Sequence, residues 1–300
     1  MAGPLITSPL IECVPNFSEG RDATTVNAIE RAIASAPGAF VLRSEMDPDH
    51  NRAVITFAGS PEAVAEGAFR GIAEAVERID LRLHKGVHPR IGAADVVPFV
   101  PLRGAGMEQC AGIARRVGQA VWERLGVPVY FYEAAARSPE RAPLENVRRG
   151  GFESPALPPD WGGPDLHPSA GASILGARPL LIAFNVNLNT EDLGVARAIA
   201  RRIRASSGGL AAVKAMGVAL PSRGCVQVSM NLTDFERTPI DRVLNTVREL
   251  ADRHGVAVAG TQTVGLVPRK AIEDAASREP EWKTFDGHLI LEDRIASAGL

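Results

Sequence analysis

The order of predicted strands and helices repeats once along this chain of 300 residues, and the repeat restricts the fold more than any other feature. In the first copy, alternating and amphipathic patterns predict strand, helix, strand, strand, helix and strand at residues 10–17, 23–36, 39–45, 53–59, 61–78 and 95–100. Ser60 and Pro61 are typical of the N-cap and first turn of a helix. The first copy therefore has the order β-α-β-β-α-β.

The second copy repeats this order. It comprises residues 180–188, 190–206, 210–220, 225–232, a helix opened by Thr238-Pro239 in the manner of Ser60-Pro61, and 256–264. We expect Thr190 to cap the first of these helices. Each copy has the split-βαβ, or ferredoxin-like, order, in which helices cover one face of a sheet. The sequence therefore predicts an α/β (α+β) fold of two ferredoxin-like βαββαβ subdomains, residues 1–178 and 179–300, with helices outside and the uncovered sheet faces free to pack together or to line a cleft.

Further segments accompany these two copies. Residues 107–125 predict a helix and 127–132 a strand, and the tail predicts a capping strand at HLILED. Residues 138–177 are rich in proline and glycine and predict no element, so this long connection is either a linker or a binding segment. We favour binding, because glycine lets a backbone approach a flat ligand closely. The candidate binding residues are Gly162, Gly163, Pro164, Asp165, Leu166, His167, Pro168, Ser169, Ala170 and Gly171.

The composition excludes several classes of protein. Apolar residues make up 45% of the chain, which is ample for packed cores. The net charge of −2 gives no electrostatic reason to expect nucleic acid or an anionic membrane as a partner. The three cysteines are far apart and suggest neither a disulfide framework nor a zinc ribbon. Without a signal-peptide pattern or an apolar run of about 18 residues, a cytoplasmic protein is expected.

The stretch LRLHKGVHPRIGAADVVPFVPL, residues 81–102, contains the densest chemistry of the chain. His84 and His88 are four residues apart, as two metal ligands on one helix face would be. However, Gly86 and Pro89 argue against a helix, and no third ligand can be identified nearby. We therefore expect no metal at this stretch.

Two interpretations of His88 remain. In the first, His88 is an ordinary exposed loop residue. In the second, which we prefer, the loop brings an imidazole to an anionic substrate. Lys85 and Arg90 would lower the pKa of the imidazole and keep it neutral near pH 7, and both could bind carboxylates. His88 is then the candidate catalytic residue.

Other polar clusters lie at the ends of predicted strands. NFSEGR, residues 16–21, follows the first strand, and EMDPDHNR, residues 45–52, joins the second to the third. Several of these side chains are of types that bind substrates, but Asp47, Asn51 and their neighbours are also ordinary turn formers. Both interpretations stay open for the candidates Asn16, Glu45, Asp47, His50, Asn51 and Arg52.

Seven stretches resemble, in their order, those of the glutamate formimidoyltransferase family. They are IECVPNFSEGR, DHNRAVITFAG, HKGVHPRIGAADVVPFVP, VPVYFY, PSAGASILGARPLLIAFNVNL, VQVSMNLTDFE and VAGTQTVGLVP. The resemblance covers nearly the whole chain and does not depend on one short motif. It implies two α/β subdomains whose sheets flank a ligand channel, commonly in a homodimer, without the cyclodeaminase domain that follows in animals.

The resemblance also implies an activity. Members of the family move a formimino group from N-formimidoyl-L-glutamate to N5 of the co-substrate tetrahydrofolate, in histidine breakdown and one-carbon metabolism. The catalytic histidine of the family maps to His88, and its folate-contacting segment maps to residues 162–171. Arg52, Lys85 and Arg90 are then candidates to bind the carboxylates of both small-molecule substrates.

Two departures from the family pattern leave alternatives open. Val87 replaces the glutamate of GEHPR, and YEAAA replaces YGEAA, so that an acid is either lost at Ala134 or displaced to Glu133. The alternatives are a folate-dependent transferase with another one-carbon donor, such as formylglutamate, and a non-catalytic folate-binding protein.

Overall fold

The computed structural model describes residues 8–300, which form two compact units. Unit 1 contains the described residues up to Pro179 together with Leu300, and unit 2 extends from Leu180 to Gly299. Each unit contains a large buried apolar cluster of its own. Within the described part of the chain, no helix has the length and apolar character needed to cross a membrane.

The first part of unit 1 has the predicted β-α-β-β-α-β order. Its elements are β1 (Ile11–Cys13), β2 (Asn16–Phe17), α1 (Ala23–Ala34), β3 (Ala39–Asp47), β4 (Arg52–Gly59), α2 (Pro61–Arg78) and β5 (Ala94–Pro101). The pieces β1 and β2 are collinear parts of one strand, because both lie between β4 and β5 and pair antiparallel with each. With β3 beside β4, the sheet order is that of a ferredoxin-like fold. This prediction is confirmed.

Unit 1 then extends its sheet beyond β5. Helix α3 (Met107–Leu125) leads to β6 (Val129–Glu133), and β7 (Ser173–Ala177) lies between β5 and β6, parallel to both. Residues 138–177 were expected to hold no element. That expectation is wrong for β7 and for two short helical turns, η1 (Pro139–Arg141) and α4 (Leu144–Val147). β7 escapes prediction because its five residues are all buried and show no alternation.

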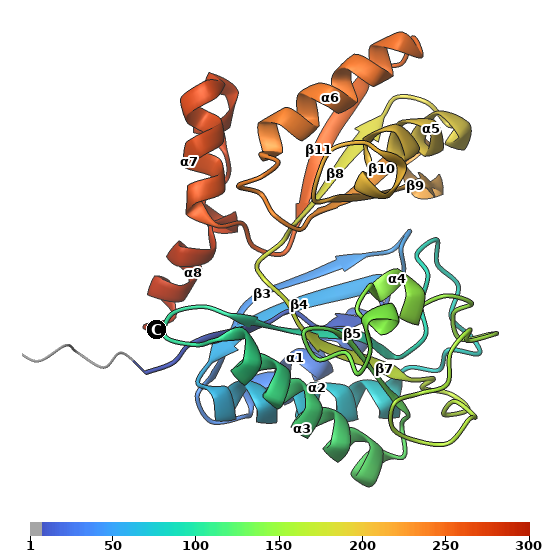
Figure 1. Cartoon of the computed structure of the whole chain (residues 1–300), viewed down its shortest axis with the longest axis vertical. Helices are drawn as coiled ribbons and strands as arrows, with labels where there is room; N and C mark the ends of the chain where they lie inside the picture. Colours follow the sequence, from blue (N-terminus) through green and yellow to red (C-terminus); the bar gives the residue numbers. More distant parts are fainter. Residues whose placement is uncertain (1–7) are drawn as a thin grey trace, which may run out of the picture. The chain divides into compact units, whose positions relative to one another are not determined.

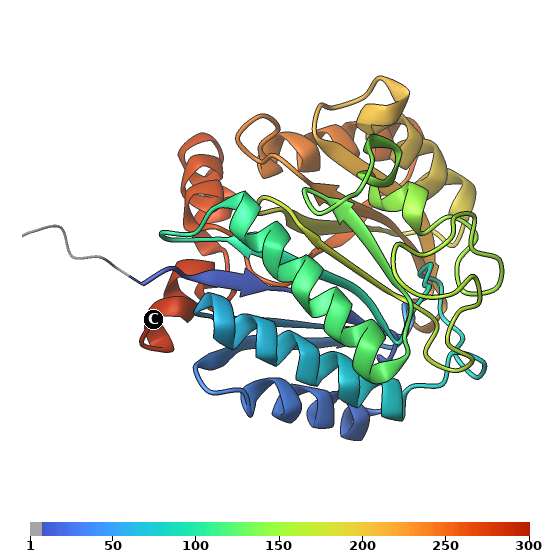
Figure 2. The same ribbon diagram turned by 60° about the horizontal axis from the view of Figure 1, so that its bottom comes forward.

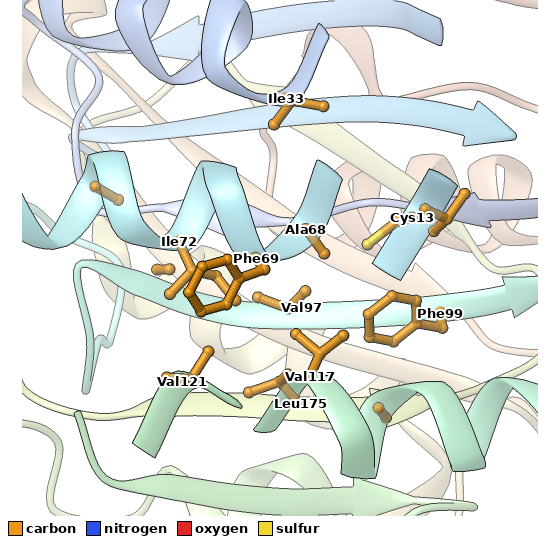
Figure 3. Close-up of a cluster of buried hydrophobic side chains, with 14 of the residues drawn as sticks. Cys13, Ile33, Ala68, Phe69, Ile72, Val97, Phe99, Val117, Val121 and Leu175 are labelled. Atoms are coloured by element: carbon orange, nitrogen blue, oxygen red, sulfur yellow. The ribbon is translucent and has the colours of Figure 1, made fainter. Parts of the chain in front are cut away.

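Helices α1, α2 and α3 lie side by side across one face of this sheet, as Figure 1 and Figure 2 show. Figure 3 shows the cluster that they bury, where Ile72 of α2 and Val117 of α3 meet Val97 and Phe99 of β5. The Ser60 hydroxyl caps α2 by accepting a hydrogen bond from the amide of Ala63, as predicted. The opposite face of the sheet, called the site face below, therefore carries the side chains that alternate with this core.

Unit 2 has the same topology with four strands. Its elements are β8 (Ile182–Leu188), α5 (Leu193–Ile203), β9 (Val213–Leu220), β10 (Cys225–Leu232), α6 (Ile240–Arg253) and β11 (Val258–Val264). The sheet order β11-β8-β10-β9 is antiparallel throughout, and α5 and α6 pack on one of its faces (Figure 1). The second ferredoxin-like copy is confirmed.

Several local expectations in unit 2 are wrong. Asp192, not Thr190, caps α5, because its carboxylate accepts from the amide of Gly194. Pro239 stands at the cap of α6 without a side-chain hydrogen bond, while the Thr238 hydroxyl donates to a carbonyl instead. The tail adds α7 (Arg269–Arg278), the turns η4 (Pro280–Thr284) and η5 (Gly287–Leu289), and α8 (Leu291–Ser297).

The predicted strand HLILED is thus a turn followed by a helix. Asp286 caps the turn by accepting from the amide of His288, and only Ile290 makes a β-bridge, to Val267. The apolar residues of this stretch are consecutive rather than alternating, which is why they suit a buried helix start as well as a strand.

Candidate active site

His88 lies in a loop, residues 79–93, that joins α2 to β5 and packs against the turn between β3 and β4. At Gly86 this packing is so close that a Cβ would stand 2.3 Å from the carbonyl oxygen of His50. Asn51, with φ of 48°, uses its amide to join two segments: its oxygen accepts from the Gly20 amide and its nitrogen donates to the Lys85 carbonyl. The loop is therefore fixed by backbone and side-chain contacts, and Asn51 serves this structure with both ends of its amide.

The His88 imidazole is half-buried and is held at Nδ1 alone. Nδ1 lies 2.8 Å from the Pro89 carbonyl oxygen and 3.1 Å from Nη1 of Arg52. One ring nitrogen cannot satisfy both neighbours, since Nδ1–H donates to the carbonyl and a bare Nδ1 accepts from the guanidinium. Among residues 8–300, no hydrogen bond reaches Nε2. That nitrogen is the one available to a substrate.

A buried ion network stands behind Arg52. Its Nη1 donates to Oδ2 of Asp95 over 2.9 Å, and its Nε donates to Oδ1 of Asn16 over 3.0 Å. Arg148, the residue that caps the C-terminal end of α4, reaches the same Asp95 oxygen at 2.9 Å. The other Asp95 oxygen accepts from the Ile91 amide at 2.8 Å. Asp95 has no exposed side-chain surface, so these contacts replace its hydration.

A β-bulge places Asp95 on the site face. Phe17 pairs with Ala94 and Asn16 with Val96, so Asp95 is the extra residue between two paired positions. Ala94 and Val97 belong to the core under the helices, whereas Val96 belongs to a second apolar cluster that the α4 segment covers. Consecutive residues Asp95 and Val96 thus both face the site side.

The surroundings hold the pKa of His88 well below its ordinary value of 6.5. Burial is the largest cause, because it penalises the charged imidazolium, and the guanidiniums of Arg52 and Arg148 add to it. The carbonyl of Pro89 acts in the opposite direction, and His50, whose ring centre is 5.8 Å away, lowers the pKa slightly. His88 is therefore neutral at pH 7 and able to accept a proton.

The predicted flanking cations are not the ones that act on His88. Arg90 donates to Glu153 at 2.9 Å and to the His84 carbonyl at 3.3 Å, while Lys85 is exposed. Sequence neighbours in a loop need not face the same way, and Arg52 and Arg148 come close through the fold instead. Lowering of the imidazole pKa by Lys85 and Arg90 is thus corrected to burial with Arg52 and Arg148.

The other predicted polar residues take different positions. Asn16 binds Arg52 and, through its nitrogen, the Val14 carbonyl. Glu45 on β3 accepts from Arg43 at 2.7 Å. Asp47 forms the turn after β3, because its Oδ1 accepts from the amides of Asp49 and His50. Arg52 therefore contacts His88, Asn16 holds Arg52, and Asp47 has the turn-forming role.

Both units of the chain match known protein families. Residues 10–178 match the family described as "Formiminotransferase domain, N-terminal subdomain", and residues 183–283 match "Formiminotransferase domain". The chain is 47% identical over 298 residues to the glutamate formimidoyltransferase of Thermoplasma acidophilum, covering 96% of this chain and 98% of the relative. The chain belongs to the formiminotransferase family.

Two other relatives differ in how much of their own length the chain matches. The glutamate formimidoyltransferase of Streptococcus pyogenes serotype M1 is 40% identical, over 95% of this chain and 98% of the relative. The formimidoyltransferase-cyclodeaminase of Mus musculus is 44% identical over 90% of this chain, but the match spans only 52% of the mouse protein.

The glycine-rich segment of this formiminotransferase lies beside the His88 loop. The Leu81 amide donates to the Ser169 carbonyl and the Ala93 amide to the Ala170 carbonyl, both over 2.8 Å. Gly171, with φ of 69°, lets the two backbones meet, since a Cβ there would stand 2.0 Å from the Ile91 carbonyl oxygen. At Gly163, by contrast, a Cβ would meet nothing within 4 Å. The segment thus has one glycine that serves packing and another that borders open space.

The departure at YEAAA has a visible backbone consequence. Glu133, which occupies the glycine position of YGEAA, has φ of 49°, in the left-handed region that favours glycine. Glu133 pairs with Ala177 in register with the rest of β6, and this pairing is compatible with either alternative, an acid lost at Ala134 or one displaced to Glu133.

Sequence reasoning missed Asp95 and Arg148. Asp95 gave a signal, because it is the one charged residue within the apolar run AADVVPFVP. Arg148 gave none, since it lies among other arginines in a segment without periodicity. Within residues 8–300, no group of three or more histidine, cysteine, aspartate or glutamate side chains is placed to hold a metal ion.

Proposed function

We propose that this formiminotransferase moves the formimino group of N-formimidoyl-L-glutamate to N5 of tetrahydrofolate, yielding 5-formimidoyltetrahydrofolate and glutamate. Sequence identities of 47% and 40% over nearly the full length of two glutamate formimidoyltransferases support the reaction. The observation that carries the assignment to a site is a neutral His88 whose Nε2 has no partner among the described residues.

The reaction needs a group that first accepts and then returns a proton. When N5 bonds to the amidine carbon, the attacking nitrogen must lose its proton, and the glutamate nitrogen must gain one before its bond to that carbon breaks. His88 Nε2 takes the first proton and delivers the second, so no net proton is consumed. Such general acid–base catalysis typically contributes about 10²–10⁴-fold.

The residues around His88 support its role as a base. Arg52 contacts the imidazole, and burial together with the charges of Arg52 and Arg148 keeps the ring neutral until the proton arrives. The open space at Gly163, in a segment fastened to the His88 loop, supports the assignment of residues 162–171 to folate. In this proposal residues 1–178 supply the catalytic imidazole and the folate segment, and residues 179–300 form the second subdomain.

The test uses purified protein with N-formimidoyl-L-glutamate and tetrahydrofolate. Glutamate release is followed together with the methenyl-tetrahydrofolate that forms on acidification. We expect turnover in the wild type and a loss of about 10²–10⁴-fold in kcat for His88→Ala. His254→Ala, which removes an exposed histidine of unit 2, is the control and keeps its activity.

Other results would contradict the proposal in identifiable ways. Tetrahydrofolate binding without turnover would point to a folate-binding protein, and turnover only with N-formyl-L-glutamate would point to another donor. Full activity of His88→Ala would remove His88 from the mechanism while leaving the reaction intact.

We further infer that the enzyme is a cytoplasmic homodimer that binds small molecules and no nucleic acid. The family resemblance supports the dimer, and the net charge of −2 supports the lack of nucleic acid binding. Light scattering of the eluted protein at micromolar concentration tests the dimer, and a mass of one chain would contradict it.

A further inference from the structure

We propose that Asp95 is the positioning residue of this active site: its carboxylate holds both the guanidinium that contacts His88 and the main chain of the loop that carries His88. The inference rests on the proposed transferase function and adds a residue to it. Asp95 touches neither the imidazole nor, by this proposal, either substrate.

One nitrogen atom links Asp95 to the imidazole. Nη1 of Arg52 lies 2.9 Å from Oδ2 of Asp95 and 3.1 Å from Nδ1 of His88. The guanidinium is planar and rigid, so fixing Nη1 on one side fixes it on the other. Asn16 holds the same guanidinium at Nε, 3.0 Å away. In the tautomer that leaves Nε2 free to accept a proton, Nδ1–H donates to the Pro89 carbonyl, so Arg52 acts on the imidazole through its contact and its charge, and Asp95 fixes where that guanidinium lies.

The second oxygen of Asp95 acts on the loop. Oδ1 accepts from the Ile91 amide at 2.8 Å, three residues after His88. Ile91 also accepts, at its carbonyl, from the amide of Ala172, the residue that follows the segment assigned to folate. One carboxylate thus joins the strand β5, the His88 loop and the Arg52 side chain of β4.

Stability alone is a poor explanation of this arrangement. Moving a carboxylate and two guanidiniums out of water costs several kcal/mol per ion, and replacing such buried groups by apolar side chains is often neutral or stabilising. Asp95 is fully buried, and the side chains of Arg52 and Arg148 are 9% and 14% exposed. A network that is expensive for the fold is better explained by the geometry that it imposes.

The charges around His88 show what the carboxylate balances. Arg52 faces the imidazole from β4, Arg148 from the end of α4, and His50 from the turn between β3 and β4. Asp95 is the anion in contact with both guanidiniums. Without it, two cations would repel each other beside the imidazole and Arg52 would lose the anchor of its Nη1.

The first experiment compares Asp95→Asn with Asp241→Asn. Asp241 is also a buried carboxylate, 5% exposed, and it accepts two hydrogen bonds of 2.7 Å from Arg278 in unit 2. We expect Asp95→Asn to lower kcat by about 10–100-fold, as loss of an orienting partner does, while KM for both substrates changes by less than about threefold. Asp241→Asn keeps its kcat, whatever it loses in thermal stability.

The second measurement needs no substrate. The ¹⁵N shifts of the His88 ring nitrogens, assigned by their loss in His88→Ala, report the tautomer and the hydrogen bonding of Nδ1. At pH 8 we expect Asp95→Asn to change these shifts and Asp241→Asn to leave them as in the wild type. A purely structural Asp95 would leave them unchanged, and that result would overturn the inference.

A double variant covers the case in which Asp95→Asn does not fold. Asp95→Asn with Arg52→Gln removes both charges of this pair, so Arg148 is the one charge of the three that remains. If Asp95 acts through Arg52, kcat of the double variant lies within about threefold of Arg52→Gln alone; losses that multiply would overturn the inference. Wild-type protein without turnover would end the proposed function, yet the NMR comparison would still decide the role of Asp95.

Discussion

At the scale of single residues, two effects of different size keep His88 neutral. Burial is the larger and the charges of the Arg52 and Arg148 guanidiniums are the smaller, and both disfavour the imidazolium. Because the pKa in the folded protein is below the 6.5 of the free side chain, the unfolded chain binds the proton more tightly. This contribution to the free energy of unfolding is therefore complete above pH 6.5 and falls as the pH drops toward the folded pKa.

Arg52→Gln separates these two effects. We expect the pKa of His88 to rise, because one guanidinium is removed, but to stay below 6.5, because burial is the larger cause. The acidic limb of kcat/KM should move upward in pH by the same amount. Titration of the His88 ring by NMR gives the pKa directly, and a value at or above 6.5 would show that the cations outweigh burial.

Glu133 offers a prediction about stability. A non-glycine residue in the left-handed region costs about 1–2 kcal/mol. Substitution by glycine removes this cost, but the greater freedom of glycine in the unfolded chain offsets part of the stabilisation. We therefore expect Glu133→Gly, at φ of 49°, to raise the free energy of unfolding by about 0.5–1 kcal/mol.

Urea unfolding measures the change, and Ala212→Gly, at φ of 57°, is the matched control with the same expected sign. A loss of stability in Glu133→Gly alone would mean that the glutamate side chain contributes more than its backbone costs.

The same scale shows how far single residues could be predicted. His88 could be identified from the sequence because glycine and proline around it predict a loop, and a loop that brings an imidazole to a substrate explained this stretch better than an ordinary exposed loop. Its actual neighbours could not be predicted, because Arg52 and Arg148 are separated from it by 36 and 60 positions (88 − 52 and 148 − 88). The side of the sheet on which Asp95 lies depends on a β-bulge, and a bulge cannot be predicted until the pairing of the two strands is known.

At the scale of elements, the segment of residues 162–171 contains two glycines with opposite tolerance. At Gly163 a Cβ meets nothing within 4 Å, so Gly163→Val should fold normally. If folate occupies that space, KM for tetrahydrofolate rises by about tenfold or more, which corresponds to about 1.4 kcal/mol of lost binding. Gly287→Val, equally open but in unit 2, should leave KM unchanged. Steady-state kinetics with varied tetrahydrofolate provide the test.

Gly171→Ala should behave in the other way. The added Cβ would stand 2.0 Å from the Ile91 carbonyl oxygen, so backbone must move, and the loss of stability should exceed about 1 kcal/mol. Thermal unfolding measures this loss. An unchanged midpoint would mean that the segment is less tightly fastened to the His88 loop than the structure shows.

Elements were predictable where their residues alternate. CVQVSMNL gives β10 from Cys225 to Leu232 without error, because its apolar and polar side chains face opposite sides of the sheet. SILGA gave no such signal for β7, since neighbours cover both of its faces. The strand predicted in the tail was wrong for a related reason, because a consecutive apolar run does not distinguish a strand from the start of α8.

At the scale of the whole molecule, the two units have separate cores, and this predicts separable stability. Ile199 of α5 is 1% exposed within the unit 2 cluster, so Ile199→Ala should cost about 2–5 kcal/mol. We expect amide exchange to accelerate in β8 and β10 while β5 and β7 keep their protection. Hydrogen exchange read by mass spectrometry checks this, and equal acceleration in both units would show a single cooperative unit.

The placement of β7 has a consequence for synthesis. Strands β5 and β6 leave the ribosome first, yet their places in the finished sheet are separated by a strand that ends only at Ala177. Until then the edge of β5 lacks its neighbour, and unpaired edges favour association between nascent chains. A pause in translation shortly after Glu133 would therefore prolong the time in which nascent chains associate through the unpaired edge of β5.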